Sequence, residues 1–479
     1  MSFNTWIFLF VFLPLSLIGY FVLAKLNNKR IAIYYLIGAN MFFYGYANIR
    51  YLYYFLGCII VNYLIIKKII RFKSKKWSIL GIALNLCALA ILKYTNFFLS
   101  TLNMAFKANF NLVKLFLPLG ISFFTFQFIA LIYDSWKGRI TEIDFTQYLL
   151  FASFFPKITQ GPIMLYQDFS EQYKKNEIYT FQIDNFAKGV YVLAIGMSKK
   201  ILIADVLGKL VDSGFGGELY SYNSGMLIIL ALCYTLQIYF DFSGYSDMAI
   251  GIALMFNVKL PQNFNSPYKA KSINSFWERW HMSLTRFFTK YLYIPLGGNR
   301  CGEKRTYFNV FIVFFLSGLW HGANYTFLVW GIMHGIFSIV ERRFKITEKM
   351  YDVVSWIYTF GFINISWIFF RANTLGDALF VVKGILKCDF RGIDNNVLST
   401  LILPEIEILF DVLNIEQYLY IFPFVFLIVL IIIILDGKNT NEKLMQFKPT
   451  GLKALTTIIL LSWSVLSFGN TVSFLYEMF

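Results

Sequence analysis

The chain has 479 residues, of which 58% are hydrophobic and 15% are charged, and its formal net charge at pH 7 is +16. A soluble chain carries roughly a quarter charged residues, and the long apolar runs that recur from end to end require lipid as their solvent. Because a β-barrel would alternate apolar and polar residues, the sequence predicts an all-α, polytopic integral membrane protein.

The basic residues gather in short loops between apolar runs, at 25–30 and 67–76 and again in the polar stretch 257–306. This distribution follows the positive-inside pattern, so the charge indicates orientation in a membrane and not affinity for nucleic acid. The five cysteines show neither close pairing nor the spacing of metal ligands. We therefore expect no disulfide and no metal site.

About eleven or twelve apolar segments have the length of a membrane-crossing helix. The first, at 6–24, has no basic leader and no small-residue cleavage site, so we expect it to be a retained span. If both short basic loops are cytoplasmic, the N-terminus lies outside. The expected spans are 6–24, 31–48, 51–66, 78–98, 113–134, 186–206, 224–256, 307–320, 325–341, 351–370, 419–436 and 453–470.

Three stretches are poor simple spans. Prolines and glycines break 146–166, where Lys157 and Gln160 lie mid-segment, and irregular backbone at membrane depth must be covered by protein or line a cavity. The stretch 257–306 is expected to be cytoplasmic or re-entrant, and 371–418 to be an amphipathic connection along the membrane surface. No repeat or linker divides the chain, so we predict one membrane domain over 1–479. Its catalytic core is placed at about 113–372, with extra helices at about 400–479.

Two carboxylates, Asp241 and Asp247, and two serine hydroxyls, Ser243 and Ser246, lie inside the apolar segment 239–247. Such groups need partners at membrane depth, and Arg279, Arg286 or a histidine are the candidates considered. A structural polar network is the favoured interpretation.

All three histidines of the chain fall between positions 281 and 334. Imidazole is the side chain best suited to move a proton near neutral pH. His321 ends an apolar run between Gly318 and Gly322, where a ligand or another helix can approach the backbone closely. The sequence favours a functional role for His321 over a packing role, because an ionisable group at membrane depth usually lines a cavity or pathway.

The other two histidines lie among tryptophans. If 276–286 is a helix, Trp277 and His281 share a face, although an interfacial helix with its tryptophans at headgroup level is the alternative. His334 is expected to make a structural hydrogen bond one turn after Trp330, with Gly331 and Gly335 as a packing ridge. There is no P-loop, dinucleotide fingerprint or nucleophile elbow, so the histidines fit general base catalysis better than a covalent triad.

Several strings in this order resemble the membrane-bound O-acyltransferase family, and particularly its bacterial branch of alginate and peptidoglycan O-acetyltransferases. The resemblance implies a helical bundle whose cytosolic and extracytoplasmic funnels meet at a thin central layer. It spans nearly the whole chain. The strings are LPLGISFFTFQ at 117–127, FFPKITQGPI at 154–163, YFDFSGYSDMAIG at 239–251, LPQNFNSPY at 260–268, FWERWHMSLTRFF at 276–288, FLSGLWHGA at 315–323 and WIFFRA at 367–372.

By this resemblance His321 matches the family's essential histidine, and His281 the second signature position, which is His, Asn or Asp in different branches. We expect O-acetylation of an extracytoplasmic polysaccharide, with acetyl coenzyme A as co-substrate and no bound cofactor. Lys269 and Lys271, with Arg279 and Arg286, are candidates to attract its phosphates. Further candidates around the donor are Trp277, Arg279, Trp280, Trp320, Asn324, Ser243, Asp247 and Gln160, with His334, Asp241 and Arg286 in supporting roles.

The resemblance also implies a bacterial cytoplasmic membrane location and an extracytoplasmic partner, an SGNH-type, esterase-like acetyl carrier or transferase. A rival within the family is the D-alanyl transferase of teichoic acid, whose donor is a small acidic carrier protein. The apolar runs after about residue 400 and the WIFFRA string favour the alginate-like branch. A rival from another class is a transporter or channel, which the absence of an inverted-repeat pattern disfavours.

Overall fold

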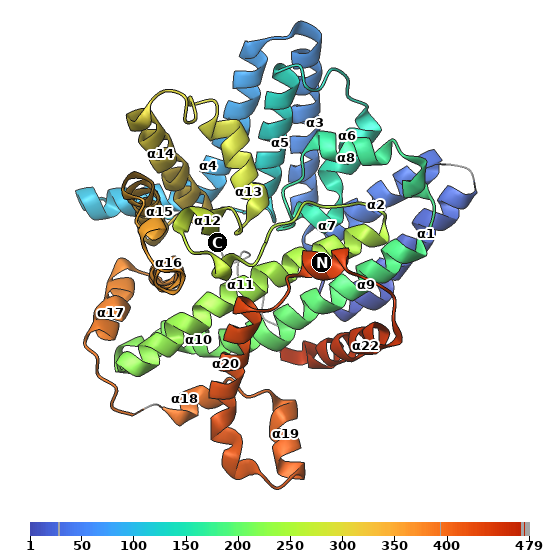
Figure 1. Cartoon of the computed structure of the whole chain (residues 1–479). Coiled ribbons are helices and arrows are strands. Elements are labelled where there is room, and N and C mark those ends of the chain that lie inside the picture. The colour runs from blue at the N-terminus through green and yellow to red at the C-terminus, as the bar shows by residue number, and fades with distance from the viewer. Residues whose placement is uncertain (27–28, 393, 471–473, 475–479) are drawn as a thin grey trace. The chain divides into compact units, whose positions relative to one another are not determined.

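A computed structural model describes residues 1–26, 29–392, 394–470 and 474. Within these residues every regular element is a helix, as the composition predicts. Figure 1 shows these helices coloured from the N-terminus to the C-terminus. The described chain divides into two compact units. Unit 1 contains Met1–Leu193, Ser246–Pro261 and Pro449–Thr457, and unit 2 contains Ala194–Tyr245, Gln262–Lys448 and Ile458–Phe479. The single domain expected over 1–479 stays a prediction.

Unit 1 contains the helices of the first part of the chain. Its core is aromatic: the rings of Phe43 and Phe155 lie 5.1 Å apart, and the buried Tyr148 hydroxyl donates to the carbonyl of Ile59 at 2.8 Å. The helices are η1 Phe8–Phe12, α1 Leu13–Lys25, α2 Lys29–Ala47, α3 Ile49–Phe72, α4 Lys75–Phe106, α5 Ile121–Trp136, α6 Phe145–Ser153, α7 Phe155–Ile158, α8 Tyr166–Tyr173 and η2 Asn176–Tyr179, followed by most of α9 Ile183–Ser198.

Unit 2 holds all three histidines. Two long helices, α11 Ser224–Met255 and α22 Gly451–Leu466, have residues in both units. The remaining helices are η3 Lys199–Ala204, α10 Asp205–Ser213, η4 Gly214–Glu218, η5 Leu219–Ser221, η6 Pro267–Lys269, α12 Ile273–Trp277, α13 Met282–Phe288, η7 Thr289–Tyr293, α14 Glu303–His321, α15 Tyr325–Phe344, η8 Thr347–Lys349, α16 Asp352–Arg371, α17 Leu375–Leu386, α18 Asn395–Ser399, α19 Pro404–Val412, η9 Glu416–Ile421, α20 Phe422–Leu435, α21 Thr440–Met445 and η10 Ser467–Asn470.

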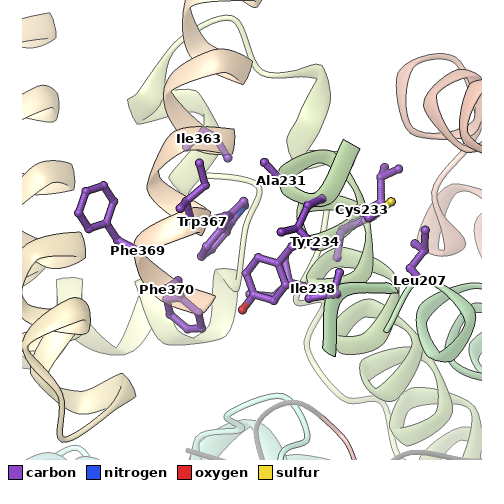
Figure 2. Packing of buried hydrophobic residues seen from close by; sticks show 14 of the residues in the cluster. Leu207, Ala231, Cys233, Tyr234, Ile238, Ile363, Trp367, Phe369 and Phe370 are labelled. Carbon is purple, nitrogen blue, oxygen red and sulfur yellow. The ribbon is translucent and has the colours of Figure 1, made fainter. Parts of the chain in front are cut away.

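The core of unit 2 joins α11 to α16. Figure 2 shows Trp367 and Phe370 of α16 lying opposite Tyr234 and Ile238 of α11, and all four are buried. Lipid tails are as apolar as these side chains, so helix association in a membrane depends on close van der Waals packing more than on removing apolar surface from water. Large rings provide that packing here.

Six helices among the described residues are long and apolar enough to cross a membrane: Phe8–Lys25, Ile49–Phe72, Lys75–Phe106, Ser224–Met255, Asp352–Arg371 and Glu416–Leu435. Other expected spans also form helices, among them α2, α14 and α15. The segment expected at 113–134 is shorter than predicted, because its helix α5 begins only at Ile121, after Gly120 in a left-handed conformation.

The broken segment at 146–166 is covered by protein, as the sequence predicts. It forms α6, the four-residue α7 and an irregular stretch that contains the buried Gln160. The buried Lys157 donates to the side-chain oxygen of Gln127, and its ammonium lies 4.0 Å from the centroid of the Phe151 ring. Irregular backbone and a buried amine are thereby accommodated inside unit 1.

The other two irregular stretches are built from short elements. The stretch 257–306 holds η6, α12, α13 and η7, none longer than seven residues, before α14 begins at Glu303. The stretch 371–418 forms α17, α18 and α19, which is consistent with helical connections. The position of either stretch relative to a membrane remains a prediction.

The buried carboxylate of Asp241 pairs with Lys200. The Lys200 ammonium lies 2.6 Å from an oxygen of Asp241 and 2.8 Å from one of Asp205, and all three side chains are buried. Lys200 belongs to the π-helical turn η3, directly before α10. The structural polar network favoured from the sequence is present at Asp241, and Lys200 takes part in it although it was not among the candidate partners, because α11 meets η3 here through a long-range contact.

Replacing Lys200 with Met is predicted to destabilise the protein by about 3–5 kcal/mol, because two buried carboxylates lose their cation. The matched control is Lys271→Met, which removes the exposed ion pair between Lys271 and Asp352 at 2.5 Å. An exposed pair contributes about 0–1 kcal/mol. Denaturant unfolding of both purified variants in detergent measures the difference, and equal effects would contradict the structural role given to Lys200.

Candidate active site

Two tryptophans connect the three histidines in unit 2. The ring of His321 lies 5.1 Å from that of Trp330, and the ring of His334 lies 4.8 Å from the same tryptophan. On the other side of His321, Trp320 lies 4.8 Å away and is 6.3 Å from His281. The clustering expected from the sequence is therefore present in space.

Close packing of α14 against α15 places His321 beside Trp330. A Cβ atom added at Gly318 would lie 2.4 Å from the carbonyl oxygen of Phe327, and one added at Gly331 would lie 2.6 Å from that of Phe314. Only glycine permits this approach of the two backbones. The sequence predicted that either a ligand or another helix approaches the backbone near His321, and at Gly318 it is the neighbouring helix α15.

His321 is the last residue of α14, and the chain turns to extended backbone at Gly322. Its ring is enclosed by Trp320, Trp330 and Phe370, each about 5 Å away between centroids, and the residue is 4% exposed. The imidazole therefore lies at the C-terminal end of a helix, where the carbonyl dipoles favour positive charge.

His281 does not lie within a helix, so the shared helical face considered for Trp277 and His281 is not formed. Helix α12 ends at Trp277 and α13 begins at Met282, and His281 between them adopts φ 44° and ψ 51°. The helix breaks because its backbone bonds to a neighbouring segment: Met282 donates to the carbonyl of Asn263, and Asn265 donates to that of Arg279, both at 2.9 Å.

A left-handed conformation is uncommon for a residue other than glycine, and such strain occurs often at functional sites. The His281 ring is fully buried and packs edge-on against Phe242 at 4.7 Å. His281 lies outside the six helices long enough to span a membrane. Burial lowers its pKa to about 3, so the imidazole is neutral at physiological pH.

His334 makes the structural hydrogen bonds predicted for it. The indole nitrogen of Trp277 donates to Nδ1 at 3.1 Å, and Nε2 lies 3.1 Å from the hydroxyl of Ser366. Because Nδ1 accepts, the proton sits on Nε2 and is donated to Ser366, whose own hydroxyl donates to the carbonyl of Ile363. With both nitrogens engaged, His334 serves as a support for α12 and α16.

Several other predicted site residues have protein partners in unit 2. Trp280 stacks on Phe276 at 5.5 Å as part of the core, and Asn324 caps α15 while donating to the carbonyl of Asn373 at 2.8 Å. Arg279 bonds to Ser275 and to the carbonyl of Asn265. These contacts give the three residues partners within unit 2, and their roles at the donor stay predictions.

The candidate phosphate-binding lysines are also engaged. Lys269 donates to the carbonyl of Gly437 at 3.1 Å, and Lys271 pairs with Asp352. Arg286 is exposed on α13, and Ser243 is buried with a hydroxyl that has no hydrogen-bond partner in the described part of the chain. The remaining candidates, Gln160 and Asp247, belong to unit 1, whereas the three histidines belong to unit 2.

Two aromatic residues that the sequence did not place at the site, Phe370 and Trp330, both contact the ring of His321. Phe370, from the WIFFRA string, forms one wall of His321. Trp330 is fully buried, and its indole N–H has no acceptor among the described residues. A buried donor of this kind beside two histidines is available to an oxygen of a ligand.

The family model of the membrane-bound O-acyltransferases matches residues 5–373. The chain belongs to this family. It is 40% identical over 419 residues to the peptidoglycan O-acetyltransferase of Helicobacter pylori. The aligned region covers 80% of this chain and 79% of that protein. It is 38% identical over 387 residues to the probable alginate O-acetylase of Pseudomonas aeruginosa, covering 78% and 73%.

A more distant relative is the teichoic acid D-alanyltransferase of Bacillus subtilis, 27% identical over 53% of this chain and 69% of that protein. Family membership and the six apolar helices together make this chain a multi-pass membrane protein and an acyltransferase. The resemblance noted in the sequence strings, and the helical fold class expected from it, are confirmed.

Replacing His281 with Asn is predicted to retain far more acyl transfer than replacing it with Val. Asparagine is neutral, can form hydrogen bonds and tolerates the left-handed backbone. Valine is β-branched, so it does not tolerate this backbone conformation, and its side chain forms no hydrogen bond. Because His281 is neutral down to about pH 3, the shape of the activity profile between pH 5 and 8 should be the same in wild type and in the Asn variant. Loss of a wild-type inflection in that range on His281→Asn would contradict this account.

Proposed function

We propose that this chain transfers acetyl groups from a cytosolic thioester to hydroxyl groups of an extracytoplasmic cell-envelope polysaccharide. The observation that carries the proposal is the 40% identity with a peptidoglycan O-acetyltransferase over 80% of the chain. The histidine cluster in unit 2 supplies residues whose chemistry suits that reaction.

In the proposed reaction, neutral His321 accepts the proton of an acceptor hydroxyl as its oxygen attacks the thioester carbonyl carbon. A C–O bond forms, and the tetrahedral intermediate then collapses with cleavage of the C–S bond. The imidazolium returns its proton to the departing sulfur. The products are an ester and a thiol, and His321 is neutral again.

The surroundings of His321 favour this role. The C-terminal carbonyls of α14 stabilise positive charge on the imidazole when it accepts a proton, and aromatic rings enclose the imidazole. Burial limits the access of water, which would otherwise hydrolyse the thioester. Neutral His281 and the indole N–H of Trp330 are hydrogen-bond donors suited to the carbonyl oxygen as it becomes negative.

We also propose acetyl coenzyme A as the co-substrate, with no resident cofactor, and an extracytoplasmic esterase-like protein as partner. The proposed location is the bacterial cytoplasmic membrane, with the N-terminus outside, because the basic loops at 25–30 and 67–76 then face the cytosol. The greater identity and coverage of the two O-acetyltransferase relatives support acetyl transfer over D-alanyl transfer.

Replacing His321 with Ala is predicted to lower acetyl transfer by about 10²- to 10⁴-fold, the range contributed by a general base. The assay follows labelled acetyl groups from acetyl coenzyme A into alkali-labile esters of envelope polymer, using membranes that contain the full chain. A D-alanyl donor is assayed in parallel.

Thermal unfolding in detergent is the control, since the variant should remain folded. Acetylation at the wild-type rate by a folded His321→Ala protein would refute the proposed base. Alanyl esters without acetyl esters from the wild-type protein would refute the proposed acyl group.

A further inference from the structure

The turn between α3 and α4 of unit 1 concentrates positive charge. Six basic residues lie within 67–76, and no acidic residue precedes Asp134 in the chain. All six side chains are exposed, and none of them forms an ion pair or a hydrogen bond with any of the described residues. The six basic residues are Lys67, Lys68, Arg71, Lys73, Lys75 and Lys76.

Two long helices fix the position of this turn. Both α3 and α4 are long and apolar enough to cross a membrane, and only Lys73 and Ser74 connect them. Further along the pair, the buried side-chain amides of Asn62 and Asn85 donate to each other, at 3.3 and 2.7 Å. The two helices are thereby held together, and the six cations lie at one surface of the membrane.

The depth of the cations matches that of lipid headgroups. Lys67 and Lys68 precede the end of α3 at Phe72 by five and four residues, which is about 6–8 Å along the helix axis. These two residues therefore lie deeper than the turn, and their long side chains reach the phosphates of the bilayer.

Aromatic side chains at the same level support an interfacial position. The ammonium of Lys68 lies 4.0 Å from the centroid of the Trp77 ring, and that of Lys67 lies 5.5 Å from the Tyr63 ring. Phe72 is exposed beside them. Tryptophan and tyrosine concentrate at the boundary between acyl chains and headgroups, because one part of each ring is apolar and another is polar.

The repulsion among these cations requires an anion from outside the chain. Lys75 and Lys76 occupy the first turn of α4, which is the positive end of the helix dipole and disfavours a cation. The phosphodiester of an anionic phospholipid is the anion present at this depth. A cluster of about four to eight Lys or Arg next to a membrane-crossing helix attracts such headgroups.

We propose that the α3–α4 turn binds anionic phospholipid headgroups, and that these lipids act as counterions that stabilise unit 1. In the proposed orientation 67–76 faces the cytosol, so the lipids belong to the cytosolic leaflet. Phosphatidylcholine does not neutralise the turn, because its headgroup carries an ammonium of its own. The lipid site is separate from the histidines of unit 2 and takes no part in acyl transfer.

A triple variant with Lys68→Gln, Arg71→Gln and Lys75→Gln tests the site. The full-length protein in detergent is titrated with phosphatidylglycerol or phosphatidylcholine, and native mass spectrometry counts the bound lipids. Each basic residue near an anionic surface strengthens binding about 5-fold. The Kd of the tightest phosphatidylglycerol should therefore rise at least about 10-fold in the triple variant. The gain in thermal stability that phosphatidylglycerol gives the wild-type protein should also be lost.

The matched control combines Lys107→Gln with Lys114→Gln, because both residues are exposed bases of unit 1 outside the cluster. It should bind phosphatidylglycerol as the wild-type protein does. A variant with Lys68→Arg and Lys75→Arg keeps the charge and should keep the affinity. Equal thermal unfolding of all the proteins in phosphatidylcholine checks that they are folded. Wild-type affinity for phosphatidylglycerol in the triple variant, or equal affinity of the wild-type protein for the two lipids, would overturn the proposal.

Discussion

The contact between α14 and α15 at Gly318 and Gly331 is the constraint on which the site depends. In lipid, helices associate through close packing, because the surrounding tails compete equally for apolar side chains. Gly318 and Gly331 let the two backbones approach closely, and the van der Waals packing that results holds α14 against α15. The result is that His321 at the end of α14 faces Trp330 on α15, and His334 lies one turn beyond.

Within unit 2, several buried polar groups have partners of matching chemistry. The nitrogens of His334 are engaged by Trp277 and Ser366, and Lys200 is held by two carboxylates. Each pairing fixes one helix relative to another within unit 2. Three aromatic rings enclose the imidazole of His321, each about 5 Å away between centroids.

Local sequence patterns predicted the features that depend on neighbouring residues. The helical spans, the close-packing glycines, the irregular segment around Pro156 and the structural role of His334 all follow from spacing and composition along one stretch. The features that the sequence did not predict depend on contacts between residues that are far apart in the chain. The break at His281 exists because Met282 and Arg279 bond to 263–265, and the partner of Asp241 lies 41 positions earlier in the chain. The residue pattern of one sequence does not show which distant residues contact each other in the fold.

The central claim is that an acyl thioester and an alcohol can both reach the imidazole of His321. A structure of the full chain in a lipid nanodisc, with a non-hydrolysable acetyl thioether analogue of coenzyme A, tests it most directly. The account predicts that the analogue's carbonyl carbon lies close enough to the His321 ring for a single acceptor oxygen to fit between them. It also predicts an opening on the opposite side through which the acceptor enters. An imidazole sealed on all sides by its aromatic walls, with the analogue bound elsewhere, would contradict it.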